Sequence, residues 1–175
     1  MLPSEGQQLK PINKIIASFV AATIAGTGAP AIAGTASSSL ASSATVSANC
    51  TVSTTAVAFG VVDTLSATPD DATGGLNVTC TSGTAWTATA GAGTGTGATL
   101  SVRKMSSGAN LLNYTLYKDS GRTSIWGDGV APTATITGTG TGSVQANIIY
   151  GRVTASQGTA VVGSYADTVA VTITF

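Results

Sequence analysis

Short segments in which apolar and small or hydroxyl-bearing residues alternate recur along this chain of 175 residues. The most regular one is 168–175, where Val, Val, Ile and Phe occupy the odd-numbered positions and Thr or Ala the even-numbered ones. Alternation with a period of two is typical of a strand with one buried face. Clusters of turn-forming residues interrupt these segments about every 8–14 residues, and no amphipathic helical pattern is present. The sequence therefore predicts an all-β domain.

The spacing of the turns and the high content of Thr and Val favour a β-sandwich of immunoglobulin-like type. We expect a loop at 69–75, in which Asp70 and Asp71 serve as ordinary turn residues rather than calcium ligands. A second, glycine-rich loop is expected at 91–97. Strands are expected within 52–62, 76–80, 86–90, 100–103, 111–117, 124–126, 133–137, 142–153 and 161–175.

The composition excludes several classes of function. Charged residues make up 8% of the chain, against about 25% in an average protein, and seven scattered Lys and Arg cannot form a phosphate-binding cluster. The chain has no His, so the commonest general base and metal ligand is missing. No G-x-S-x-G or complete G-x-G-x-x-G motif occurs. We therefore expect a structural protein that is not an enzyme, holds no cofactor or metal and binds no nucleic acid.

The N-terminus has the pattern of a secretory signal peptide. Two Lys precede the apolar run 15–25, and Ala31-Ile-Ala33 forms a small-residue cleavage motif before Gly34. A transmembrane helix needs about 20 apolar residues, and glycines and a proline end this run earlier. We predict that 1–33 is removed between Ala33 and Gly34, with Ala36 as the second candidate. The mature protein would be exported and would contain no membrane span.

Cys50 and Cys80 are the two cysteines of the chain, 30 positions apart. In an exported protein an even pair of cysteines predicts one disulfide. Two thiols without His or further nearby ligands make a poor metal site, and no C-x-x-C motif is present.

The segment 34–49, rich in Ser, Thr and Ala, leaves two interpretations open. Composition alone is typical of a flexible tail. In an extended strand, however, a small and partly apolar face would alternate with a hydroxyl-rich face. The first face would consist of Ala36, Ser38, Leu40, Ser42, Ala44, Val46 and Ala48.

Three blocks of the sequence resemble a known family. The first is the frame from Cys50 through Phe59-Gly60 to Leu76-x-Val-Thr-Cys80. The second is Asn113-Tyr-Thr-Leu-Tyr-Lys-Asp119, followed by Arg122-Thr and Trp126-Gly. The third and most specific is Gly163-Ser-Tyr-Ala-Asp-Thr-Val-Ala-Val-Thr-Ile-Thr-Phe175. Together they resemble the spore coat protein U domain of Csu-type (archaic) chaperone–usher pilus subunits, over about 36–175.

The resemblance implies an incomplete immunoglobulin-like sandwich, 50–175, that lacks its last strand and is completed by donor-strand exchange. A periplasmic chaperone would fill the open groove, and at an outer-membrane usher the N-terminal extension of the next copy would replace it. The extension 34–49 would be the donor strand, with Leu40, Ala44 and Val46 filling the groove. The groove edge and chaperone-recognised strand would consist of Val169, Val171, Ile173 and Phe175.

The function implied by the resemblance is that of a shaft subunit of a surface pilus, which supports attachment and biofilm formation. Its partners would be further copies of itself, the chaperone, the usher and a tip subunit. Two alternatives stay open: a secreted coat protein that self-associates, and an exported carbohydrate-binding module that is complete as a monomer.

Replacing Cys50 by Ala should lower the yield of exported subunit more than it changes the geometry of any assembly. Opening a loop of 30 residues costs roughly 3–4 kcal/mol on the loop-closure model. Yield is measured on non-reducing gels against the double variant C50A/C80A, which removes the effect of the free thiol. An unchanged yield would argue against a structural disulfide.

Overall fold

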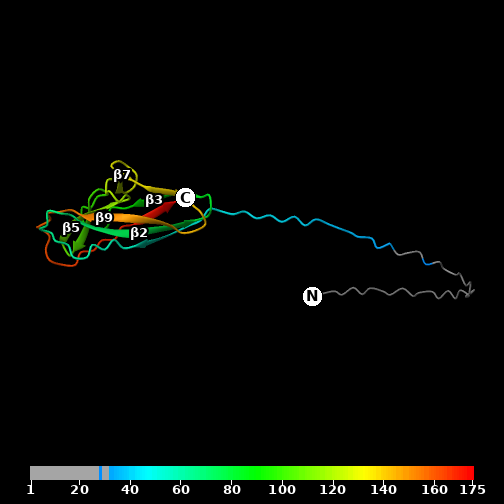
Figure 1. The fold of residues 1–175 in the computed structure, drawn as a ribbon, viewed down its shortest axis with the longest axis horizontal. Helices are drawn as coiled ribbons and strands as arrows, with labels where there is room; N and C mark the ends of the chain where they lie inside the picture. Colours follow the sequence, from blue (N-terminus) through cyan, green and yellow to red (C-terminus); the bar gives the residue numbers. More distant parts are fainter. Residues whose placement is uncertain (1–27, 29–31) are drawn as a thin grey trace, which may run out of the picture. The chain divides into compact units, whose positions relative to one another are not determined.

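Ten strands form two sheets in the computed structural model, which describes residue 28 and residues 32–175 (Figure 1). The signal peptide predicted at 1–33 lies almost entirely outside these residues. By its internal contacts the chain divides into Met1–Ser43 and Ala44–Phe175. Residues 32–49 contain no strand, and their side chains are exposed. No helix long and apolar enough to cross a membrane occurs in the described part of the chain.

The larger sheet carries most of the domain. Its hydrogen-bonded order is β1 (Cys50–Thr55), β2 (Asp70–Cys80), β9 (Gln145–Val153), β5 (Asn110–Tyr117), β6 (Ile125–Trp126) and β7 (Thr133–Ala134). β4 (Arg103–Ser107) also pairs with β5. The smaller sheet has the order β10 (Val171–Thr174), β3 (Ala85–Ala90) and β8 (Ile136–Thr139). Of the strand pairs, β6 with β7 is parallel and the others are antiparallel.

The prediction of an all-β sandwich is confirmed. Several strand boundaries are wrong. The strand expected at 161–175 is confined to β10, and the strand expected at 100–103 begins only at Arg103. The loop expected at 69–75 is largely strand, because β2 begins at Asp70 and pairs with β9 along Asp70–Val78. The long strand expected at 52–62 ends at Thr55. Beyond Thr55 burial still alternates along the chain: Val57 and Phe59 are half-buried, and the residues on either side of each are exposed.

The core lies between the sheets and consists of inward-facing residues at alternate positions. β2 and β3 contribute three such residues each, which are at most 3% exposed. This alternation follows from the period of two that predicted the strands. The core residues are Leu76, Val78, Cys80, Trp86, Ala88, Ala90, Leu112, Tyr114, Leu116, Trp126, Ile149 and Val153.

The predicted disulfide between Cys50 and Cys80 is present. The two residues lie directly opposite each other in the β1–β2 ladder, with their Cα atoms 4.1 Å apart. It therefore joins the start of β1 to the end of β2 at one end of the sandwich. At the same end, Thr81 exchanges hydrogen bonds with Asn49 and donates one to the carbonyl of Ser47 (3.4 Å).

Arg103 is a fully buried cation at the start of β4. Its guanidinium donates short hydrogen bonds to three backbone carbonyls, those of Gly91 (2.8 Å), Leu100 (3.0 Å) and Trp126 (2.7 Å). These carbonyls belong to the loop that follows β3, to the approach to β4 and to β6. A single side chain thus ties the edge of the larger sheet to the glycine-rich loop.

Replacing Arg103 by Met should lower the free energy of unfolding by about 3 kcal/mol or more, because buried carbonyls lose their donors. The matched control is Arg152→Met on β9, where a partly exposed ion pair is lost and the change should stay below about 1 kcal/mol. Urea unfolding followed by tryptophan fluorescence measures both. Equal losses in the two variants would contradict the clamping role of Arg103.

Candidate functional site

Two unpaired strand edges flank the candidate site. β1 ends the order of the larger sheet, and β10 ends the order of the smaller sheet. Among the residues that the structure describes, each strand therefore has a neighbour on one side only, β2 for β1 and β3 for β10. Unpaired edges of this kind present backbone amides and carbonyls to any strand that can lie beside them.

The free side of the C-terminal segment can be identified from its hydrogen bonds. Ala166 exchanges backbone hydrogen bonds with Ser106 of β4 (2.9 and 3.1 Å), and the carbonyl of Ala170 accepts one from Gly91 (2.9 Å). In an extended chain the backbone groups of successive residues point to opposite sides. Odd-numbered residues such as Asp167 and Val169 therefore direct their backbone groups away from β3 and β4, toward the open side.

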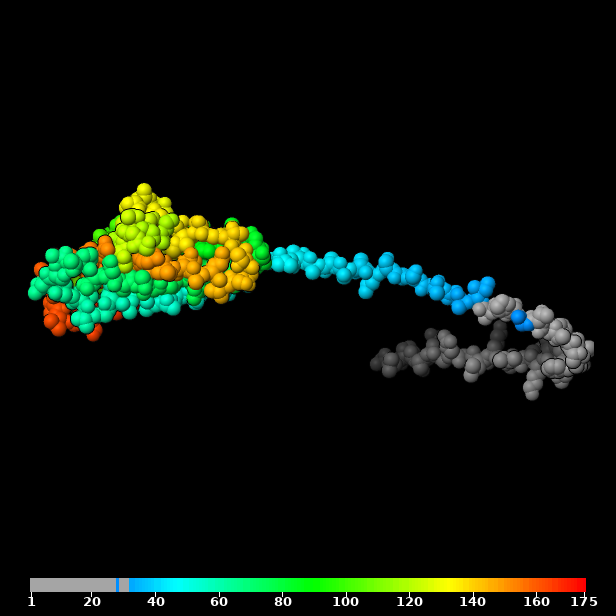
Figure 2. All heavy atoms as spheres, in the orientation of Figure 1, coloured from blue at the N-terminus to red at the C-terminus, as the bar shows by residue number. Residues whose placement is uncertain are grey.

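A groove runs between 54–64, which includes the end of β1, and 160–171, which leads into β10. It consists of two hollows of about 370 and 600 Å³. The hollows share four lining residues: Val57, Phe59, Met105 and Tyr165. Figure 2 shows the 60s and the 160s side by side at one end of the domain, where the larger hollow lies.

The floor of the groove is the core of the sandwich. Core residues from three strands line it, among them Leu116 of β5, Trp126 of β6 and Ile149 of β9. On β1, Val52 faces inward because it lies opposite buried Val78, yet it is 43% exposed. An inward-facing valine at this exposure indicates that the sandwich lacks cover along this edge.

Glycines let one wall of the groove pack closely on the larger sheet. A Cβ atom at Gly151 of β9 would lie 2.5 Å from the side chain of Val57 and 2.8 Å from the ring of Phe59. The Phe59 ring also meets Tyr114 edge-on, with the ring centroids 6.1 Å apart. Val57 and Phe59 therefore pack on the larger sheet, and their side chains leave the groove open.

A cluster of polar side chains lies among the residues that line the smaller hollow. The hydroxyl of Tyr114 donates to Asp167 Oδ2 (2.7 Å), while Asp167 Oδ1 accepts from the amide and hydroxyl of Thr94 (2.7 and 2.8 Å) and from the Thr168 amide (2.7 Å). Partial burial raises the pKa of Asp167, but the hydrogen bonds from Thr94 and Tyr114 outweigh it, so this pKa lies below the ordinary carboxyl value. Gly93, with φ +88°, adopts a left-handed conformation beside the carboxylate, where a Cβ atom would collide with it.

Of the four residues predicted to form the groove edge, two line the groove and two do not. Val169 and Val171 line it, and Ile173 packs against the core. Phe175 follows the end of β10 and is 55% exposed. The predicted donor residues Leu40 and Val46 are 96% and 82% exposed, and their role stays a prediction.

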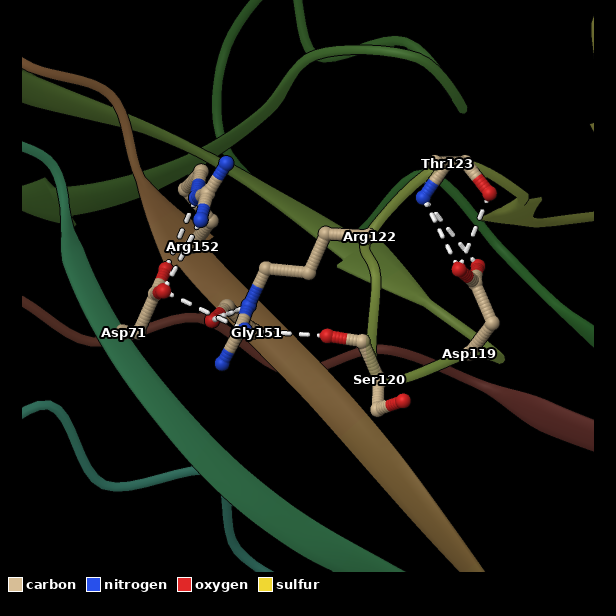
Figure 3. A network of polar contacts seen from close by, with 7 residues as sticks. All are labelled: Asp71, Asp119, Ser120, Arg122, Thr123, Gly151 and Arg152. Carbon is tan, nitrogen blue, oxygen red and sulfur yellow. Dashed lines mark hydrogen bonds and ion pairs between the residues drawn. The ribbon is translucent and has the colours of Figure 1, made fainter.

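A second polar network, missed by sequence reasoning, lies on the outer face of the larger sheet (Figure 3). Asp71 accepts two hydrogen bonds from Arg152 (2.8 and 2.9 Å) and forms an ion pair with Arg122 (3.2 Å). Asp119 holds the turn that carries Arg122 by accepting from Thr123 and from the Ser124 amide. The interpretation of Asp71 as a turn residue is wrong, because its partners are distant in the chain.

No group of three or more His, Cys, Asp or Glu residues able to hold a metal occurs within residues 32–175 or at residue 28. A model of the spore coat protein U domain matches residues 36–172. The chain belongs to the spore coat protein U domain family. The match begins inside the predicted extension 34–49, so most of that extension is part of the domain as the family defines it. No match to a curated protein is found.

Among solved structures, a similar fold occurs in the crystal structure of the CsuC–CsuE chaperone–tip adhesion subunit pre-assembly complex from archaic chaperone–usher Csu pili of Acinetobacter baumannii. The TM-score is 0.55 and the sequence identity 21%; the alignment covers 75% of this chain and 40% of that one. At this identity the likeness is one of fold. This spore coat protein U domain chain spans less than half the length of the matched chain.

The Asp167 cluster should make the spore coat protein U domain less stable in acid. A carboxyl whose pKa is lowered by folding contributes stability above its unfolded pKa and loses it as the pH falls through the folded pKa. Between about pH 5 and pH 2.5, the loss of unfolding free energy should therefore be smaller in Asp167→Asn than in the wild type. Tyr114→Phe, which removes one of the hydrogen bonds, should give an intermediate slope in urea titrations. An undiminished slope in D167N would refute this assignment.

Proposed function

We propose that this protein is a structural subunit of a chaperone–usher pilus and polymerises by donor-strand complementation. The observation that carries the proposal is the groove between two unpaired edges, whose floor is the core of the sandwich. A strand that enters this groove would cover apolar surface and pair with free backbone groups at once. Both gains are largest for an extended segment with one apolar face.

The extension 34–49 supplies such a segment. Its apolar face, with Leu40, Ala44 and Val46, is exposed in the single chain. Ser47 and Asn49 are hydrogen-bonded to Thr81 at the end of the sandwich that carries the disulfide, so the extension leaves the domain at that end. β1 then runs from that end toward the groove, which begins at Thr54.

The rest of the proposal follows from this mode of assembly. Residues 1–33 serve as the signal peptide, 34–49 as the donor strand and 50–175 as the pilin domain. The subunit passes through the periplasm, where a pilus chaperone fills the groove with a strand of its own, and an outer-membrane usher exchanges that strand for the next subunit's extension. The completed fibre, with a tip subunit, stands on the cell surface and supports attachment and biofilm formation.

A self-associating coat protein is the second candidate, because the same groove and extension would also join subunits that no usher assembles. Recovery of surface fibres from cells expressing this protein, but not from cells lacking the usher, distinguishes the pilus from such a coat. A carbohydrate-binding module complete as a monomer is disfavoured by the half-buried apolar residues that line the groove, such as Val57, Phe59 and Val169.

The exported wild-type protein should form a ladder of multimers on denaturing gels without heating, and one band after boiling, since strand-exchange polymers dissociate slowly. Leu40→Asp should abolish the ladder by placing a charge in an apolar groove. Ser39→Asp, on the opposite face of the extension, is the matched control and should keep it. A wild-type protein that is monomeric both in unheated gels and in size exclusion would overturn the proposal.

A further inference from the structure

Met105 is the one methionine of residues 34–175, and the two cysteines of the chain are joined in a disulfide. Its thioether is therefore the one sulfur of the mature subunit that is not already oxidised. Peroxides convert such thioethers to sulfoxides where the sulfur can be reached from solvent. The place of Met105 in the fold thus decides whether the subunit has a site for this modification.

The side chain of Met105 lies where the two hollows of the groove meet. Its strand, β4, pairs with β5 on one side and contacts the C-terminal segment through the bridge between Ser106 and Ala166. In the β4–β5 ladder Met105 lies opposite buried Leu112, so its side chain faces the core. Met105 is half-buried and lines both hollows, so a small molecule that enters either hollow reaches it.

The surroundings of Met105 suit a thioether better than a sulfoxide. The other residues that line both hollows are Val57, Phe59 and Tyr165. Val57 and Phe59 have no polar side-chain group, and the Tyr165 hydroxyl already donates to the carbonyl of Val161 (2.7 Å). Oxidation converts the thioether into a polar group with a hydrogen-bond acceptor. In the free subunit this acceptor would depend on water in the hollows.

A strand that enters the groove would displace this water. The side chains expected to fill the groove, those of Leu40, Ala44 and Val46, carry no hydrogen-bond donor. An acceptor that is buried without a partner costs the free energy of its desolvation. The inserted strand would therefore shield the thioether from peroxide, whereas a sulfoxide formed beforehand would oppose insertion.

We propose that Met105 is an oxidation site that is open in the free subunit and covered by the donor strand of a second copy, and that its sulfoxide blocks insertion of this strand. The inference rests on the proposed function. In the reaction the sulfur attacks one oxygen of hydrogen peroxide, the O–O bond breaks, an S–O bond forms and water leaves. The sulfur loses two electrons and the peroxide gains them. Methionine sulfoxide reductases reverse the change.

Peroxide footprinting of the full chain tests whether the donor strand covers the site. Leu40→Asp should be a monomer with an open groove, whereas Ser39→Asp should form multimers as the wild type does. Met105 should be oxidised about tenfold faster, or more, in L40D than in either multimer, because a covered residue reacts only when the strand opens. Mass spectrometry of the peptide that carries Met105 measures the rates. Equal rates in L40D and in the multimers would overturn the proposal and leave the proposed function standing.

A synthetic peptide with the sequence of 34–49 tests whether the sulfoxide blocks insertion. Fluorescence anisotropy of the labelled peptide should show binding to L40D. Peroxide treatment of L40D should weaken this binding about tenfold or more, as expected for a buried acceptor without a partner. The matched control is L40D/M105L, which has an apolar side chain of similar volume and no thioether, so peroxide should leave its affinity unchanged. Reduction by a methionine sulfoxide reductase should restore the affinity of L40D.

Three results of the peptide experiment would overturn the block. Oxidised L40D could bind as tightly as the untreated protein, or L40D/M105L could lose affinity as well, which would assign the effect to another residue. Oxidised L40D could also lose its native tryptophan fluorescence, to which Trp126 in the smaller hollow contributes, and the sulfoxide would then unfold the domain. Failure of untreated L40D to bind the peptide, together with a wild type that forms no multimers, would instead refute the proposed function.

Discussion

The partly covered apolar surface between β1 and β10 is the constraint on which the rest of this structure depends. Exposed apolar surface costs free energy, so a sandwich with an open side would normally close by collapse of its walls or recruit another chain. Here Leu116, Trp126 and Ile149 are at most 6% exposed and form the floor of a groove, whose sides carry half-buried apolar residues such as Val57, Phe59 and Val169. The remaining architecture holds the two edges of this groove apart.

Several interactions outside the groove supply the necessary rigidity. The disulfide secures the start of β1, and Arg103 links β4 and β6 to the glycine-rich loop. On the outer face of the larger sheet, Arg122 joins the turn after β5 to Asp71 of β2. Each of these connects segments far apart in the chain. The two edges of the groove can thereby keep a defined position instead of forming a loosely packed side of the domain.

The polar cluster of Tyr114 and Asp167 fixes the C-terminal segment to the rest of the domain. The Asp167 carboxylate accepts hydrogen bonds from Tyr114 of β5 and from Thr94 of the glycine-rich loop. A hydrogen bond depends on the position of single atoms, whereas apolar contacts depend on area. The cluster therefore defines where one edge of the groove lies.

Sequence alone determined the class of the fold, the disulfide and the likeness to the spore coat protein U family, because these depend on local alternation, on composition and on motifs. The strand signal at 168–175 needs no partner to be recognised. Other features were decided only by the tertiary structure. Asp71 and Gly74 are residue types that are common in turns, yet both lie in β2 because this stretch pairs with β9. The side chain of Asp71 also accepts a hydrogen bond from Arg152. Burial of Arg103 and the position of Asp167 in the groove depend on residues distant in the chain, and no local pattern encodes such contacts.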